Sequence, residues 1–392
     1  MKKGLGQFFT PHPFADLLVA GINKNKKKIL DLGCGDGRLG ISALYQNKNG
    51  FYVGVEKDNL QAEIASSNLE NYGYRKLIFN DDALSEKLEE KLIELGEFDL
   101  ALGNPPYLTH PNKDEFQNIV EKVFPGLTLS PNSFRMELIF LARSISHLKP
   151  GGSFSFILPK YLFSSERYKS FRELLLDTAS RIQVIELPDR IFNGAEVSTC
   201  MLKGDVGKRA RKITLGKANN SASIIEKVII SRQEAIGRMD FSYHQMMRKM
   251  GVDFDEKLPT LRTLGVELKR GSRSRSKFIE QSLSHFHTVD FPKSSDFISF
   301  DSEMKECYVT ARGGDILVPR VGARILDRQV MVENGEKAIT DCVYRLRAPN
   351  DIAGKVFELL QSEIGKKWRI ANSRGSCAKY ITNDSLLSLP IV

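Results

Sequence analysis

The 392-residue sequence has little cysteine, a single tryptophan and no long apolar run. Its five cysteines are an odd number and none stands in a Cys-x-x-Cys pair, which argues against a disulfide framework and a cysteine-rich zinc site. No stretch approaches the roughly 18 apolar residues of a membrane span, and the lysines after Met1 precede no apolar signal segment. These absences predict a protein of the reducing cytoplasm without membrane spans. The six histidines suggest no metal site.

Basic residues outnumber acidic ones. The sequence has 57 Lys and Arg against 48 Asp and Glu, which gives a net charge of +9 and a pI near 9.1. This excess fits a polyanionic partner and fits an ordinary basic enzyme equally well. The chain length favours two domains, and a hydrophobic content of 41% is enough for a large core.

The first half alternates short apolar runs with amphipathic stretches. Strand-length runs that are apolar on both faces and separated by helices are typical of a parallel sheet covered on both faces. We therefore predict a doubly wound α/β domain, Rossmann-like in architecture, over residues 1–204. The runs lie at 28–31, 51–55, 76–79, 98–102, 153–158, 182–187 and 198–202, and the amphipathic stretches at 59–71, 84–95, 133–148 and 164–178.

The pattern weakens after residue 204. Residues 205–257 are predicted to form a connection that includes a helix at 223–236. Short β-like pieces separated by Gly-rich turns follow, and then a helix at 351–363. This change predicts a second, α+β domain over residues 258–392. Its β-like pieces lie at 315–319, 329–333 and 343–347.

A glycine-rich loop, residues 31–37, follows the first predicted strand. Glycines at this place let the backbone approach a ligand closely. The stretch that starts at Gly35 also matches G-x-G-x-x-G, with an acid, Glu56, 21 residues later, which is the dinucleotide pattern. The charges of the residues around the loop distinguish a dinucleotide from a cationic cofactor.

Carboxylates surround the glycine loop. Asp31 begins it, before the first glycine, Asp36 lies inside it, and Asp82 follows the third predicted strand. A pyrophosphate needs bare N–H groups and no carboxylate nearby, whereas the sulfonium and ammonium groups of S-adenosylmethionine suit acidic surroundings. The acids therefore favour S-adenosylmethionine, with Glu56 on the ribose hydroxyls. The alternative is that these acids only cap helices.

A second loop, Asn104-Pro105-Pro106-Tyr107, follows the predicted strand at 98–102. A simple turn needs no such stiffening, whereas two consecutive prolines fix φ and remove N–H groups. The Pro105 carbonyl is therefore expected to be held rigidly. The connection that follows, residues 108–131, is long enough to act as a lid or a substrate contact.

With these motifs in this order, the chain resembles the gamma group of DNA adenine-N6 methyltransferases, the TaqI-like enzymes. Residues 6–11 look like the N-terminal cofactor motif, 31–37 like the cofactor loop and 104–107 like the catalytic motif. Residues 191–194 look like the later motif whose aromatic side chain, here Phe192, helps to hold the target base. The resemblance covers residues 4–204; residues 314–320 and 375–392 resemble target-recognition segments more loosely.

The resemblance implies methyl transfer from S-adenosyl-L-methionine to N6 of an adenine rotated out of duplex DNA. The Asn104 side-chain oxygen and the Pro105 carbonyl would accept the two N6–H groups, held by Pro106, while Tyr107 and Phe192 hold the base. The implied cofactor contacts are Thr10, Asp31, Gly33, Gly35, Glu56, Asp82 and Asn104. Thr10 is equally well explained as a helix cap, and Phe192 as a core residue.

Residues 269–277 carry five positive charges in nine residues. Such a segment suits phosphate contacts, and a solvated charged loop is the alternative. The candidate DNA-binding residues are Arg270, Arg273, Arg275, Lys277 and Arg320. Other arginines that could read guanine are Arg312, Arg324, Arg328, Arg345 and Arg347.

Other functions stay open at this point. The acceptor could be RNA, a protein glutamine or cytosine N4 instead of adenine. The chain could also be a specificity or DNA-binding module without catalysis, or a nicotinamide dehydrogenase. A separate cognate restriction endonuclease is a possible partner, because the sequence shows no nuclease motif.

Overall fold

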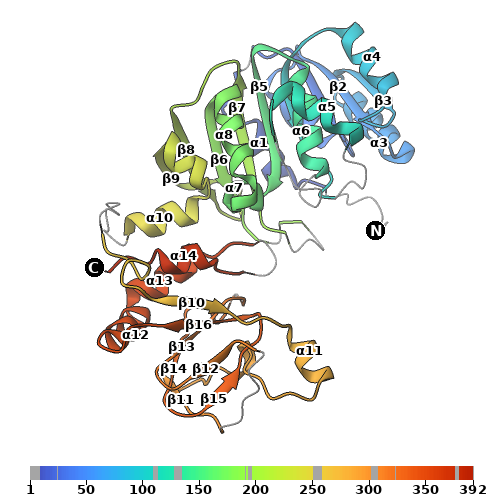
Figure 1. The fold of residues 1–392 in the computed structure, drawn as a ribbon. Helices are drawn as coiled ribbons and strands as arrows, with labels where there is room; N and C mark the ends of the chain where they lie inside the picture. The colour runs from blue at the N-terminus through green and yellow to red at the C-terminus, as the bar shows by residue number, and fades with distance from the viewer. Residues whose placement is uncertain are drawn as a thin grey trace. The chain divides into compact units, whose positions relative to one another are not determined.

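The computed structural model describes residues 9–23, 25–108, 114–127, 135–189, 191–192, 197–249, 258–301, 308–322, 324–375 and 379–391. The chain divides into two compact units, Met1–Phe241 and Ser242–Val392 (Figure 1). Within the described residues, none of the helices combines the length and the apolar character needed to cross a membrane.

A nine-stranded sheet forms the centre of the first unit. Its strand order is β3-β2-β1-β4-β5-β7-β6-β8-β9. The strands in this order are β3 (Arg75–Asn80), β2 (Phe51–Glu56), β1 (Lys28–Leu32), β4 (Phe98–Gly103), β5 (Leu148–Pro159), β7 (Thr199–Val206), β6 (Ala179–Glu186), β8 (Lys212–Ala218) and β9 (Ile224–Ser231).

Helices cover both faces of this sheet, as predicted. Helices α1, α2 and α3 contribute to one hydrophobic cluster, and α4, α5, α6, α7, α8 and α9 to the other. The bounds are α1 (His12–Val19), α2 (Arg38–Gln46), α3 (Asn59–Asn71), α4 (Glu86–Leu95), α5 (Asp114–Val123), α6 (Met136–Ser146), α7 (Tyr161–Ser164), the 3-10 turn η2 (Glu166–Tyr168), α8 (Lys169–Thr178) and α9 (Arg232–Gly237).

The sheet is mixed, where a parallel one was expected. The neighbours from β3 through β5 are parallel, but β7 runs antiparallel between β5 and β6. The physical reason for the error is that apolar runs reveal burial on both faces and say nothing of strand direction. The bend expected at residues 193–194 lies outside the described residues.

The predicted connection at 205–257 is wrong in its first part. Residues 212–231 form β8 and β9, which extend the sheet, and the helix expected at 223–236 begins only at Arg232. The run from Ile224 to Ile230 is rich in β-branched residues, which favour a strand, and it pairs along its length with β8. The first unit therefore extends to Phe241.

The second unit contains a five-stranded sheet with the order β10-β16-β13-β14-β11 and a two-stranded sheet, β12-β15. The predicted strands near 315–319, 329–333 and 343–347 are confirmed, and the predicted helix at 351–363 is α12, with α13 directly after it. The elements are α10 (Phe241–Lys249), β10 (Glu267–Arg270), α11 (Arg275–Glu280), η3 (Thr288–Asp290), β11 (Phe297–Ile298), β12 (Thr310–Arg312), β13 (Ile316–Pro319), β14 (Val330–Val332), β15 (Glu336–Ala338), β16 (Val343–Arg347), α12 (Ala353–Gln361), α13 (Glu363–Ala371) and α14 (Asn383–Leu387).

Candidate active site

The two sequence motifs lie at neighbouring strand ends. Strands β1 and β4 are parallel, with Asp31 opposite Leu102, and the strand order reverses between them. In an open α/β sheet, ligands bind beyond the carboxyl ends of the strands at such a reversal. The glycine loop after β1 and the Asn-Pro-Pro-Tyr loop after β4 (residues 104–107, hereafter the catalytic loop) therefore leave the sheet side by side.

The backbone of the glycine loop adopts conformations that favour glycine at three positions. Gly33, Gly35 and Gly37 have φ values of 77°, 56° and 79°, in the left-handed region. A Cβ on Gly37 would also lie 3.2 Å from the Cβ of Ala65 on α3. The backbone N–H of Gly33 donates to the Val55 carbonyl at 2.8 Å, which folds the loop against the end of β2.

Asp31 is fully buried at the end of β1. Its Oδ2 accepts a hydrogen bond of 2.7 Å from the hydroxyl of Tyr52, and its Oδ1 has no partner among the described residues. Burial raises the pKa of Asp31 to about 7, with the Tyr52 hydrogen bond opposing and the charge of Glu56 adding to the rise. Gly40 and Gly54 leave room for the Tyr52 ring, because a Cβ on either would lie within 3 Å of it.

The other predicted acids have ion-pair or hydrogen-bond partners within the protein. Asp36 pairs with Arg38 at 2.8 Å, and Asp82 with Lys57 at 2.8 Å. Glu56, at the end of β2, accepts the backbone N–H of Gly35 at 2.9 Å. Asp31 and Glu56 thus supply the carboxylates next to the loop. These carboxylates, with the buried Oδ1 of Asp31 that has no partner among the described residues, fit the cationic cofactor predicted for this site.

Asn104 is held by contacts on both sides of its amide. Its Nδ2 donates to Thr10 Oγ1 at 3.2 Å, and its Oδ1 accepts from the Tyr107 hydroxyl at 2.8 Å. That hydroxyl also lies 3.3 Å from the Ile157 carbonyl on β5. Burial and the negative charge of Glu137 hold the pKa of the Tyr107 phenol well above its usual range, so the hydroxyl stays a donor.

The residue before Asn104 must be glycine. A Cβ on Gly103 would lie 2.5 Å from the Phe156 ring, which packs against the last residue of β4. Pro105, two residues further, is buried and Pro106 is half-buried. The catalytic loop therefore starts from a closely packed strand end and continues through two residues with fixed φ.

Thr10 connects the catalytic loop to the helix that follows the glycine loop. Arg38, the first residue of α2, donates Nη1 to the Thr10 carbonyl at 2.9 Å, while the Thr10 hydroxyl contacts Asn104. The alternative that Thr10 caps a helix is wrong, since α1 begins after Pro11 and has no side-chain cap. Hydrogen bonds of Thr10 thus join the start of α2 to the catalytic loop.

The family model described as N-6 DNA Methylase matches residues 1–249, more than half of the chain. The chain belongs to this family. The family confirms the predicted resemblance, the methyltransferase fold and S-adenosyl-L-methionine as the cofactor. The match ends shortly after the first unit.

Known relatives agree with this assignment over part of the chain. Type II methyltransferase M.HincII of Haemophilus influenzae is 27% identical over 237 residues, 60% of this chain and 44% of that protein. A release factor glutamine methyltransferase of Clostridium botulinum is 28% identical over 166 residues, 40% of this chain and 56% of that protein. The chain thus spans about half the length of these relatives.

A solved chain from a type I restriction-modification system shares the fold. It superposes with a TM-score of 0.50 at 17% identity, over 71% of this chain and 63% of that chain.

Phe192 is placed differently from the other motif residues of this methylase family member. It is 3% exposed and belongs to the hydrophobic cluster that includes Ile185, Leu187 and Met201. This burial agrees with the alternative of a core residue; as it stands in the structure, the ring is not open to a base. The rest of its motif, residues 193–196, lies outside the described residues.

Sequence reasoning missed two arginines that support the loops. Arg38 follows the glycine loop directly and bonds Thr10, and Arg135 donates to the Tyr107 carbonyl at 3.3 Å. The first could have been found from its place at the start of a helix. The second follows the long connection after the catalytic loop, so nothing in the local pattern linked it to Tyr107.

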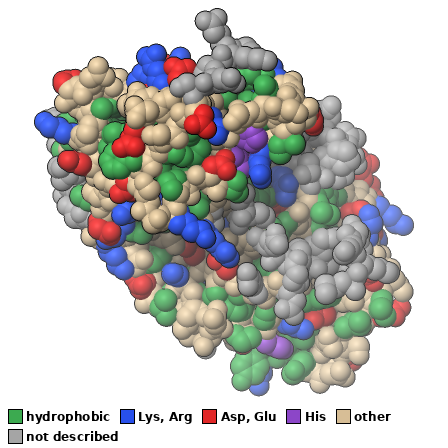
Figure 2. Space-filling model, turned by 90° about the horizontal axis from the view of Figure 1, so that it is seen from below, with side chains coloured by type: hydrophobic (Ala, Val, Ile, Leu, Met, Phe, Trp, Pro, Cys, Tyr) green, Lys and Arg blue, Asp and Glu red, His purple; other side chains and the backbone are tan. Residues whose placement is uncertain are grey.

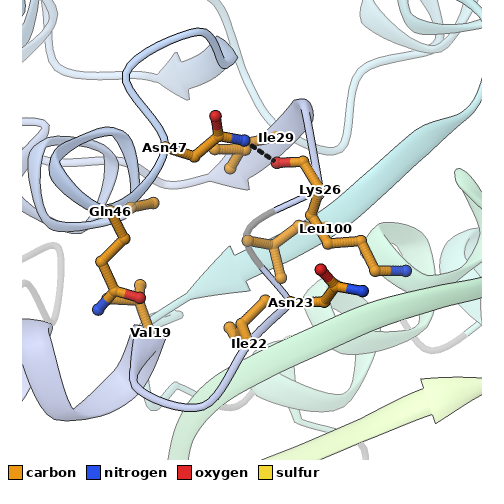
Figure 3. Close-up of a pocket in the computed structure, with 9 residues that line it drawn as sticks. Val19, Ile22, Asn23, Lys26, Ile29, Gln46, Asn47 and Leu100 are labelled. Atoms are coloured by element: carbon orange, nitrogen blue, oxygen red, sulfur yellow. Dashed lines mark hydrogen bonds between the residues drawn. The ribbon is translucent and has the colours of Figure 1, made fainter.

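A small cavity lies beside the amino-terminal parts of β1 and β4 (Figure 3). It is lined by Val19 at the end of α1, Ile29 and Leu100 on the strands, and Asn47 after α2, whose amide donates to the Lys26 carbonyl at 2.9 Å. About 20 Å³ is open to a water-sized molecule, which is room for one water. The cavity is therefore too small for the cofactor or a base.

The predicted DNA-binding residues fall into two groups in the second unit. Arg270 and Arg320 both donate Nε to the Asp341 carbonyl, at 3.0 and 2.8 Å. Arg275 and Lys277 are exposed on α11. The face seen in Figure 2 shows Lys and Arg interspersed with Asp and Glu in its described part.

Three other basic candidates make contacts inside the second unit. The Arg273 guanidinium lies 5.0 Å from the Tyr308 ring centre. Arg345 pairs with Glu267 at 2.7 Å, and Arg347 pairs with Asp315 at 2.7 Å. The last two arginines therefore take part in ion pairs of the unit, and their contact with guanine stays a prediction.

Proposed function

We propose that this chain is a site-specific DNA methyltransferase that modifies N6 of an adenine rotated out of duplex DNA. The observation that carries the proposal is the orientation of Asn104 by Thr10 and Tyr107, beside the glycine loop of an N-6 DNA methylase fold. An amide at this place offers an oxygen to an amino group at the point where the cofactor loop leaves the sheet.

The Asn104 oxygen and the Pro105 carbonyl would act as a pair of acceptors. The lone pair of an adenine amino group is delocalised into the ring, so the group is a poor nucleophile. Two acceptors on its two N–H groups favour a tetrahedral nitrogen and localise that lone pair. Thr10 fixes Nδ2 and Tyr107 fixes Oδ1, and an amide oxygen, which has two lone pairs, can accept from Tyr107 and from the base together.

Tyr107 has two roles in this proposal. Its hydroxyl orients Asn104, and its half-buried ring offers a surface on which an extruded base can stack. Such stacking is worth roughly 1–3 kcal/mol per base. Rotation out of the duplex is required because a paired adenine keeps its amino group inside the stack.

The cofactor would be held by Asp31, Glu56 and the glycine loop, with Thr10, Asn104 and Asp82 as further contacts. S-adenosylmethionine supplies the methyl group as an electrophile. The carboxylates of Asp31 and Glu56 provide negative charge for a cationic ligand, and Gly33 and Gly35 allow its close approach to the backbone.

The second unit would recognise the DNA target through basic residues such as Arg320 and those of α11. A cognate restriction endonuclease in another chain remains a proposed partner, and location in the cytoplasm stays a prediction. The test is incubation of genomic DNA with labelled cofactor, followed by nucleoside analysis and mapping. We expect labelled N6-methyladenine at one short sequence; label in N4-methylcytosine or no label in DNA would contradict the proposal.

A second candidate acceptor is a protein glutamine, favoured by the similarity to the release factor glutamine methyltransferase. That relative matches 166 residues, which is 40% of this chain. The two candidates differ in their need for residues 242–392. Labelling of a glutamine-containing release factor with undiminished rate after Arg275 and Lys277 are both replaced by alanine, together with no labelling of DNA, would favour the protein substrate.

A further inference from the structure

A buried polar cluster lies next to the catalytic loop. Glu137, in the first turn of α6, is 0% exposed. Its Oε1 accepts hydrogen bonds from Arg135 Nε at 3.2 Å and from the Tyr161 hydroxyl. The Arg135 guanidinium lies 5.5 Å from the Tyr161 ring centre, and Tyr161 stacks on Tyr168 at 5.5 Å. Residues from α6, α7 and η2 thus meet around one carboxyl group.

The cluster contacts the catalytic loop directly. Arg135 Nη2 donates to the Tyr107 carbonyl at 3.3 Å, and the Met136 N–H donates to the Leu108 carbonyl at 3.0 Å. The residues that follow Asn-Pro-Pro are therefore attached to the start of α6. The guanidinium that makes the first contact is itself held by Glu137.

Stability alone does not account for this arrangement. A buried ion pair is seldom more stabilising than apolar residues of similar volume. Burial raises the pKa of Glu137, while the Tyr161 hydrogen bond and the charge of Arg135 oppose the rise. The start of a helix also favours a negative charge. The polar cluster therefore fixes the Arg135 guanidinium in one orientation.

We propose that Arg135, Glu137 and Tyr161 are positioning residues for methyl transfer. Glu137 and Tyr161 hold the Arg135 guanidinium, which fixes the Tyr107 carbonyl and keeps the Tyr107 hydroxyl on Asn104. They act through the loop and are not catalytic residues. The inference rests on the proposed function, because it gives these residues a role in orienting the acceptor amide.

The main test is the Tyr161→Phe variant of the full chain, which removes one hydroxyl and keeps the ring. Methyl transfer to DNA is measured in a single turnover, with separate measurements of cofactor and DNA affinity. A small displacement of a reacting group costs up to about 100-fold in rate. We expect the single-turnover rate to fall by about 10- to 100-fold, with both affinities within about threefold of wild type.

Matched variants separate positioning from packing. Tyr168→Phe removes a hydroxyl from the other ring of the same stack and should keep the wild-type rate. Glu137→Gln keeps the shape of the side chain but weakens the hold on Arg135, so its rate should fall as that of Tyr161→Phe does. Arg135→Lys keeps the positive charge but should also be slower than wild type, since an ammonium lacks the planar fork that bonds both Glu137 and Tyr107.

Two results would overturn the inference. One is a wild-type rate for Tyr161→Phe. The other is a loss of rate, cofactor affinity and unfolding temperature in parallel in both tyrosine variants, which shows a general packing role. If wild-type protein fails to methylate DNA, the proposed function fails first. Hydrogen exchange of the amides at Tyr107 and Leu108 then still tests the cluster: Tyr161→Phe should speed it and Tyr168→Phe should not.

Discussion

The catalytic loop and the basic segment of the second unit contrast in how their residues are held. Asn104 is fixed by a neighbouring glycine, two prolines and two side-chain hydrogen bonds. In the second unit, Arg275 and Lys277 extend from α11, whereas Arg345 is 5% exposed and paired with Glu267. A motif that restricts its own backbone reveals its geometry in the sequence, whereas a charge does not reveal its partner.

Replacing Asn104 should have the largest effect. Asn104→Ala removes one acceptor of the amino group and should lower methyl transfer on the order of 100- to 1,000-fold, as the loss of one preorganised catalytic hydrogen bond does. Cofactor affinity, measured by calorimetry, should stay near the wild-type value. Rapid filter assays of label transfer to DNA give the rate.

Asn47→Ala is the matched control for this change. It removes an amide that donates to a backbone carbonyl, that of Lys26, near the amino end of β1. It should leave the transfer rate unchanged. A rate of Asn104→Ala equal to that of the control would show that the catalytic loop is only a turn.

Asp31 should make the stability of the first unit depend on pH. Its folded pKa of about 7 lies above the ordinary 3.8, so between these values the folded state binds more protons than the unfolded state. The free energy of unfolding therefore falls as pH rises through this window, by on the order of 4 kcal/mol for this group. Asp31→Asn should remove that loss.

Urea unfolding of Asp31→Asn and wild type from pH 4 to pH 8 checks the prediction. Far-UV circular dichroism follows both units, and the fluorescence of the single tryptophan, Trp368 in α13, identifies the transition of the second. The free energy of unfolding of the variant should rise relative to that of wild type as pH rises. A difference that stays constant over this pH range would mean that burial does not raise the pKa of Asp31.

Much of the site could be predicted because glycine and proline restrict the backbone. The glycine loop, Asn104 and the places of the first five strands along the chain follow from residue types and their spacing. The contacts of Arg38 and Arg135 could not, because each joins segments distant in sequence. The ion pairs of Asp36 and Asp82 were missed for a related reason, since local composition does not show which cation lies beside a carboxylate.

The boundary of the first unit was missed for another reason. Strand β9 is an edge strand in which only two of eight residues are buried, so its pattern lacks the apolar continuity of the central strands. Phe192 shows a limit of motif reading in the other direction. Its motif predicts a contact with the base, whereas burial in the hydrophobic cluster depends on segments distant in sequence, which the motif does not show.

Gly103 should be the point at which backbone and catalysis are coupled most closely. The Cβ of Gly103→Ala would lie 2.5 Å from the buried Phe156 ring, so the strand end or the ring must move. Overpacking of this kind costs about 1–3 kcal/mol of stability. We also expect slower methyl transfer, because Asn104 is the next residue.

A second substitution tests the cause of that loss. Phe156→Leu in the Gly103→Ala background makes room at the strand end and should restore part of the rate. Gly237→Ala serves as the control, since a Cβ there would meet nothing within 4 Å. Unchanged stability and rate in Gly103→Ala would show that the strand end adapts without cost to the catalytic loop.

The smallest effect is expected in DNA binding, where the two kinds of arginine should differ. Replacing Arg275 and Lys277 together by alanine removes up to two phosphate contacts and should make the plot of log affinity against log salt shallower by about 2, or roughly 0.9 for each contact. Arg345→Met should leave that slope unchanged and lower stability instead, because Glu267 then loses one of its two cationic partners among the described residues and keeps Lys269. Fluorescence anisotropy with a labelled duplex between about 50 and 200 mM salt measures both slopes. An unchanged slope in the α11 variant would remove this helix from the DNA interface, and a shallower slope for Arg345→Met would mean that its ion pair opens to bind phosphate.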